Sequence, residues 1–114
     1  AIQCQIDGAV VMGLGQAVFE ETLFNNEGKI INGNYRDYKI PTMLDAPFNK
    51  GMESGFVGTP HKDGPYGAKG IGEVAMVPIM PAIANAINNA MGVKLNDLPM
   101  TKERVWRALH PERA

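Results

Sequence analysis

Glu73 is the residue whose type and position best suit chemistry. It follows a loop rich in glycine at residues 58–72 and precedes an apolar run from Val74 to Met80. Apolar surroundings disfavour the charged form of a carboxylate, which is how a glutamate becomes a general base near neutral pH. The alternative is an ordinary carboxylate in the first turn of a helix, interacting with the helix dipole. From these residues alone the second interpretation is favoured.

Glycines beside Glu73, and a glutamine near the N-terminus, are candidates for ligand contacts. Gly67, Gly70 and Gly72 lack the Gly-Lys-Ser or Gly-Lys-Thr of a phosphate-binding loop, so a structural loop is the simpler interpretation. Glycines nevertheless allow a backbone to approach a ligand closely. Gln5, which we expect just before the first helix, could hold a polar cofactor atom or be an ordinary surface residue.

The residue types do not indicate a metal site, a serine nucleophile or a disulfide. His61 and His110 are far apart in sequence and belong to no ligand motif, so no metal site is predicted. Ser54 is the only serine and does not lie in a nucleophile elbow. Cys4 is the only cysteine, which excludes an internal disulfide, and we expect it to be a small buried apolar residue.

The composition indicates one compact domain over residues 1–114. Hydrophobic residues make up 45% and charged residues 20% of the chain, which excludes a disordered tail and a membrane protein. Eleven Lys and Arg against 12 Asp and Glu give no support for a nucleic acid or an anionic membrane as partner. No signal peptide or spanning segment is visible, so we expect a cytoplasmic protein. The first residue is not Met, which leaves an upstream N-terminus open.

Three segments have helical signals. Apolar residues at four-residue steps predict a helix from Ile6 to Glu21, whose internal glycines require close packing. A second helix is predicted from Pro81 to Met91, ended by Gly92. A third is predicted to begin after Thr101 as its N-cap and to end at His110-Pro111.

Short extended segments are predicted between the first two helices. Asn25–Gly28 is a turn signature, and the apolar or aromatic segments around Ile30, Tyr38 and Phe56 are bounded by Gly, Pro or Asn. We therefore expect an α+β fold in which the helices pack on a small mixed sheet made from these three segments.

Five stretches in order resemble one enzyme family. Residues 67–73 read Gly-Ala-Lys-Gly-Ile-Gly-Glu, followed by Val-Pro-Ile-Met-Pro-Ala-Ile-Ala-Asn-Ala-Ile at 77–87. The others are Gln-Ile-Asp-Gly-Ala at 5–9, Gly-Leu-Gly-Gln-Ala at 13–17, Asp-Tyr-Lys-Ile-Pro-Thr at 37–42 and Asp-Leu-Pro-Met-Thr at 97–101. Together they closely resemble the C-terminal part of the molybdenum-binding subunit of the xanthine dehydrogenase and aldehyde oxidase family, the molybdenum hydroxylases.

The resemblance implies a catalytic role for Glu73. In this family the glutamate that ends the glycine-rich motif is the base at the molybdenum centre. The resemblance implies that Glu73 takes a proton from a molybdenum-bound hydroxide whose oxygen attacks an electron-poor carbon, while hydride passes to a sulfido ligand. The family's pterin-contacting glutamine matches Gln5, and Gly70 and Gly72 would let the loop approach the metal. The resemblance thus reverses the preference for an ordinary carboxylate.

The resemblance also implies cofactors and partners. The full subunit would carry molybdopterin and hydroxylate a purine-like heterocycle or an aldehyde with water as oxygen donor. Iron–sulfur clusters and FAD would belong to other domains or subunits. Because the family's subunit is several times longer, we expect the isolated chain to be an inactive fragment whose partner is the rest of that subunit. Its uncovered apolar faces favour self-association.

Two points stay open. Many relatives have Pro after the motif glutamate, whereas this chain has Val74, so the exact substrate is undetermined. The alternative function is a free-standing assembly or interaction module that keeps the fold without the chemistry. The coding sequence upstream of Ala1 separates the two, because an initiator Met directly before Ala1 supports the module.

Overall fold

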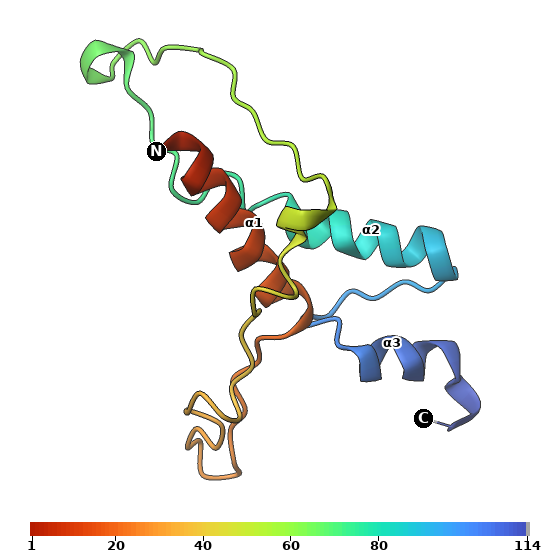
Figure 1. Ribbon diagram of the computed structural model, residues 1–114. Helices are drawn as coiled ribbons and strands as arrows, with labels where there is room; N and C mark the ends of the chain where they lie inside the picture. The colour runs from red at the N-terminus through yellow and green to blue at the C-terminus, as the bar shows by residue number, and fades with distance from the viewer. Residues whose placement is uncertain (114) are drawn as a thin grey trace.

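The computed structural model describes residues 1–113, and for Asn49 and Lys50 it describes the backbone alone. The described elements are α1 (Ile2–Val18), α2 (Ile79–Met91) and α3 (Lys102–Leu109), with the 3-10 turns η1 (Pro47–Lys50), η2 (Pro65–Gly67) and η3 (Pro111–Arg113). Figure 1 shows α1 at the centre, α2 and α3 to one side of it, and two long loops that extend away from the helices.

The molecule is more extended than its composition predicts. Its radius of gyration is 17.5 Å, and its principal extents are 56 × 36 × 28 Å. A compact domain of this length would have a radius of gyration of about 13 Å. The buried apolar residues among residues 1–113 are Ala9, Ala17, Ala46 and Met100. The expectation of a compact domain is therefore wrong, because the described residues turn too little apolar surface inward to make a large core.

Helix α1 is confirmed, with shifted bounds. It runs from Ile2 to Val18 instead of Ile6 to Glu21. It ends where the backbone N–H groups of Phe19 and Glu20 both donate to the carbonyl of Gly15, at 2.9 and 2.8 Å. These bonds satisfy a carbonyl of the last turn and stop the helix. Gln5 consequently lies inside α1, and not before it as predicted.

Close packing between α1 and α2 depends on Gly13. A Cβ at this position would lie 2.6 Å from Cβ of Ile79, so any larger residue would push the helices apart. This agrees with the close packing predicted for the glycines of the first helix. Gly8 is different, because a Cβ there would meet nothing within 4 Å, and the close packing predicted for Gly8 is wrong.

The two later helices are confirmed. Helix α2 begins at Ile79, two residues before the predicted Pro81, and ends at Gly92, whose φ of 71° is left-handed. At the start of α3 the hydroxyl of Thr101 accepts a hydrogen bond from the backbone N–H of Arg104 at 3.2 Å, as an N-cap does. None of the described helices is both long and apolar enough to cross a lipid bilayer.

The predicted mixed sheet is not found in residues 1–113, so the α+β assignment is corrected to helices joined by long loops. The Asn25–Gly28 turn forms, but the strand pairing beyond it is a single antiparallel bridge between Phe24 and Ile30. The side chain of Asn34 accepts from the backbone N–H groups of Arg36 and Asp37, which curls the chain where a strand was predicted. Phe56 lies in a segment that has no strand partner among the described residues. Isolated extended segments of this kind are marginal without a neighbouring strand.

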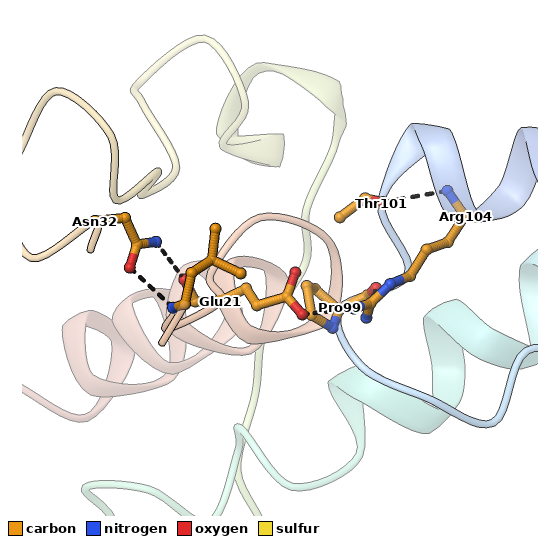
Figure 2. A network of polar contacts seen from close by, with 6 residues as sticks. Glu21, Asn32, Pro99, Thr101 and Arg104 are labelled. Atoms are coloured by element: carbon orange, nitrogen blue, oxygen red, sulfur yellow. Dashed lines mark hydrogen bonds and ion pairs between the residues drawn. The ribbon is translucent and has the colours of Figure 1, made fainter. Parts of the chain in front are cut away.

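A polar network joins the end of α1 to the start of α3 (Figure 2). The buried amide of Asn32 donates to the carbonyl of Glu21 at 2.7 Å and accepts from the backbone N–H of Leu23 at 2.9 Å. The guanidinium of Arg104 donates to the Glu21 carboxylate and, at 2.8 Å, to the carbonyl of Pro99. These bonds hold three segments of the chain together where the apolar core is small.

Candidate functional site

The glycine-rich loop lies against the N-terminal turns of α1, and the two enclose connected cavities. The loop that carries η2 passes close to the N-terminus in Figure 1. One open cavity of about 490 Å³ is lined by residues that include Ile6, Gly70 and Val74. A neighbouring cavity of about 410 Å³ is lined by residues that include Ile2, Thr59 and Gly67. Both share the lining residues Phe56, Val57, Lys69, Gly70 and Ile71.

Glu73 follows this loop and is exposed. Its backbone carbonyl accepts from the N–H of Met76 at 3.0 Å, which begins a series of turns leading into α2. No hydrogen bond or ion pair joins its carboxylate to another described side chain. Val74 and Val77 are 59% and 65% exposed, so the apolar wall expected around Glu73 is not formed by the described residues.

Gln5 is exposed on the second turn of α1. Its backbone N–H donates to the carbonyl of Ala1 at 3.1 Å, whereas its side-chain amide makes no hydrogen bond to another described residue. The amide is free to donate to, and accept from, a ligand. Ile6, the next residue, lines the larger cavity, whereas Gln5 is not among its lining residues.

Gly70 and Gly72 leave open backbone at the end of the loop. A Cβ at either position would meet nothing within 4 Å, so packing among the described residues does not require glycine there. Both positions are exposed. Open glycine backbone of this kind suits close approach to a ligand.

The larger cavity is lined by Gly70 and by sequence neighbours of two other predicted site residues. Gly70 lines it directly, Ile6 beside Gln5 lines it from α1, and Val74 beside Glu73 lines it from the other end of the motif. Of the four predicted site residues, Gly70 is thus in the cavity lining, whereas Gln5, Gly72 and Glu73 are not.

Two comparisons with known proteins relate the chain to a cofactor-binding domain and to a family of enzymes. Residues 1–47 match the molybdopterin cofactor-binding domain model. The xanthine dehydrogenase molybdenum-binding subunit of Escherichia coli O157:H7 is 40% identical over 107 residues, which cover 93% of this chain and 14% of that protein. The chain belongs to the molybdenum hydroxylase family.

Two further relatives also match nearly the whole of this chain and a small part of their own length. The 6-hydroxypseudooxynicotine dehydrogenase complex subunit gamma of Paenarthrobacter nicotinovorans is 36% identical over 104 residues, covering 90% of this chain and 13% of that protein. The crystal structure of quinoline 2-oxidoreductase from Pseudomonas putida 86 matches with a TM-score of 0.83 and 31% identity, over 96% of this chain and 14% of that one. The chain thus spans about one seventh of the length of the relatives it matches.

The other candidate residues lie in ordinary surroundings. Cys4 is exposed on α1, so its predicted burial is wrong. His61 accepts from the backbone N–H of Asp63 at 3.2 Å, and His110 stacks on Trp106 with ring centroids 4.7 Å apart. Within residues 1–113, no three His, Cys, Asp or Glu side chains gather closely enough to hold a metal ion.

Sequence reasoning missed the contacts that hold the site together. Ser54 donates to the carboxylate of Asp7 at 3.1 Å and also contacts the amide of Gln3, which ties the chain near Phe56 to the first turns of α1. The Lys69 ammonium donates to the hydroxyl of Thr59. The partners of Ser54 are 47 and 51 positions away, so no local pattern could have indicated them.

Proposed function

We propose that this chain supplies the catalytic base and part of the cofactor site of a molybdenum hydroxylase that oxidises a purine-like heterocycle or an aldehyde. The observation that supports the proposal is the cavity lined by Ile6, Gly70 and Val74, of which Ile6 and Val74 directly follow Gln5 and Glu73 in the chain. Two relatives are a xanthine dehydrogenase subunit and a quinoline 2-oxidoreductase, and their names support a nitrogen heterocycle as substrate.

In this reaction a C–H bond of the substrate is replaced by a C–O bond with oxygen from water, and two electrons and two protons leave. The bound molybdenum cofactor supplies a Lewis-acidic metal that takes up the two electrons. Glu73 is the general base, and its carboxylate accepts the proton of the attacking oxygen. A base suits this role only if its carboxylate is not held by another group, and that of Glu73 has no ion pair among the described residues.

The remaining residues bind and orient. The side-chain amide of Gln5 would donate to and accept from polar atoms of the pterin ring, because it makes no hydrogen bond to another described residue. The backbone of Gly70 and Gly72 would approach the cofactor, since glycine places no Cβ between the chain and a ligand there. A side chain at either position would enlarge the distance between cofactor and base.

We further infer that the catalytic unit is a larger subunit of which this chain is the C-terminal part, and that the isolated chain is inactive. An apolar groove of about 360 Å³ between α1 and α2, lined by residues that include Val10, Leu14 and Ile83, supports this inference. Exposed apolar grooves are typical of surfaces that another part of a protein covers. Iron–sulfur and flavin domains or subunits would then receive the electrons.

The reaction class is tested with the intact subunit in isotopically labelled water. Xanthine, hypoxanthine and an aldehyde are each incubated with the enzyme and an artificial electron acceptor. The masses of the products are then measured by mass spectrometry. We expect at least one substrate to gain one oxygen that carries the label. Absence of product from all three, or product oxygen that comes from dissolved dioxygen, contradicts the proposal.

A further inference from the structure

The two ends of the 59–69 loop are joined to each other. The Lys69 ammonium donates to the hydroxyl of Thr59, ten positions earlier in the chain. Just inside this link, the backbone N–H of His61 donates to the carbonyl of Gly67 at 3.0 Å. One side-chain bond and one backbone bond therefore close residues 59–69 into a ring.

Close contacts inside the ring require glycine at two positions. Gly67 has a φ of 79°, and a Cβ there would lie 2.7 Å from Cβ of Pro60. A Cβ on Gly64 would collide with the carbonyl oxygen of Ala68. The N–H groups of Gly67 and Ala68 donate to the carbonyls of Gly64 and Pro65, at 2.8 and 3.0 Å. These contacts restrict the backbone of the ring at Gly64 and Gly67.

The segment that leaves the ring has much less support. Gly70 and Gly72 are exposed and have open space at the Cβ position, and glycine backbone samples more conformations than any other residue. Lys69 is thus the last anchored residue before Glu73. Lys69 also lines both cavities of the site. Its hydrogen bond to Thr59 therefore holds the chain at the edge of these cavities.

We propose that the Lys69–Thr59 hydrogen bond positions Gly70–Glu73, and thereby sets where the Glu73 carboxylate lies when it accepts its proton. Lys69 and Thr59 are positioning residues that act through Glu73, and the inference rests on the base role proposed for Glu73. A displacement of about 1 Å at a reacting group can cost up to about 100-fold in rate, so a loosened anchor has a measurable effect.

The first test uses the intact, cofactor-loaded enzyme with Thr59→Val, which keeps the size of the side chain and removes the acceptor. We expect kcat to fall about 10-fold with KM changed less than about twofold, because a displaced base impairs the chemical step more than binding. Thr59→Ser retains the hydroxyl, so we expect its kcat to be close to that of the wild type and above that of Thr59→Val. Lys69→Met matches Thr59→Val, and the double variant is no slower than either single variant, since both remove one interaction.

Lys62→Met is the matched control. Lys62 belongs to the same loop, but its ammonium lies 3.9 Å from the carboxylate of its neighbour Asp63 and makes no link across the ring. The substitution Lys62→Met therefore removes a lysine from the loop without opening the ring, and we expect the kcat of this variant to equal that of the wild type.

A second readout does not depend on activity. Hydrogen exchange of the intact subunit, with and without bound cofactor, reports the amides of residues 59–73. Thr59→Val is expected to speed exchange across this peptide in both states, whereas Lys62→Met leaves it at the wild-type rate.

Three outcomes overturn the inference: unchanged kcat and exchange in Thr59→Val, failure of Thr59→Ser to restore kcat, or additive losses in the double variant. Glu73→Gln, assayed in parallel, separates this failure from failure of the proposed function. If Glu73→Gln is inactive and Thr59→Val is like wild type, only the positioning role is wrong. If Glu73→Gln is as active as wild type, the base role itself is wrong.

Discussion

Arg104 of α3 donates from its guanidinium to the carboxylate of Glu21, 83 positions earlier in the chain (Figure 2). Both side chains are 36% exposed, so the pair lies at the edge of the molecule and not in a core. The same network includes Asn32, which fixes the backbone of Glu21 just beyond the end of α1. The helix that carries Gln5 at one end is therefore held at its other end by polar contacts with α3.

Removal of the Arg104–Glu21 pair should loosen α3. We expect Glu21→Gln and Arg104→Met each to lower the free energy of local opening of α3, with a coupling of about 0.5–1 kcal/mol in the double-mutant cycle. The measurement is hydrogen exchange at the amides of residues 102–109. Glu103→Gln is the control, because it breaks the exposed pair with Arg107 inside α3 and leaves the link to α1 intact. Equal and additive effects of all three changes would contradict this role.

Gly13 and Gly8 should respond oppositely to alanine. Gly13→Ala places a Cβ against Ile79 and should destabilise the packing of α1 on α2 by about 1–3 kcal/mol. Gly8→Ala meets no neighbour in the chain and should stabilise α1 by about 0.5–1 kcal/mol, because alanine loses less backbone entropy in a helix. Chemical unfolding of the purified chain, followed by circular dichroism, measures both. A stabilising effect of Gly13→Ala would show that the helices are not packed as described.

The phenol of Tyr38 should lose its proton at a higher pH than an ordinary tyrosine does. Its hydroxyl donates to the Glu20 carboxylate at 2.9 Å, and this bond, with partial desolvation and the Glu20 charge, raises the pKa of Tyr38 above its ordinary value of 10.0. A group that holds its proton more tightly when folded contributes stability below pH 10.0 and loses it as pH rises through the raised pKa.

Ultraviolet titration of tyrosinate measures this shift in a variant with Tyr35 and Tyr66 replaced by Phe. Glu20→Gln in the same background should return the pKa of Tyr38 toward its ordinary value, because the negative acceptor is lost. An unchanged titration after Glu20→Gln contradicts the assignment.

Local signals in the sequence predicted the helices well. Gly92 ends α2 with a left-handed φ of 71°, and Thr101 caps α3, because both effects depend only on residues within one turn. The predicted sheet was not found because, unlike a helix end, it depends on residues far apart in the sequence. A strand requires a partner at a distance, and Asn34 offered the backbone near Tyr38 a local turn instead.

The candidate site was predicted only through the family resemblance. The local pattern around Glu73 favoured an ordinary carboxylate, and the described residues leave Glu73 exposed without an apolar wall. What the structure adds is the proximity of the loop to α1, seen in the cavity that Ile6 and Gly70 share. The Thr59–Lys69 link is also new, because a Lys–Thr pair ten residues apart has no signature in sequence.

The most direct test of the central claim is the single-turnover rate of substrate oxidation by the intact enzyme carrying Glu73→Gln. The rate is compared with wild type at equal molybdenum content, and Glu53→Gln, which changes an exposed carboxylate away from the glycine motif, is the control. We predict that Glu73→Gln slows oxidation by about 100-fold or more while Glu53→Gln stays at the wild-type rate, because the amide cannot accept the proton. A Glu73→Gln rate within about threefold of wild type would contradict the role of Glu73 as the base.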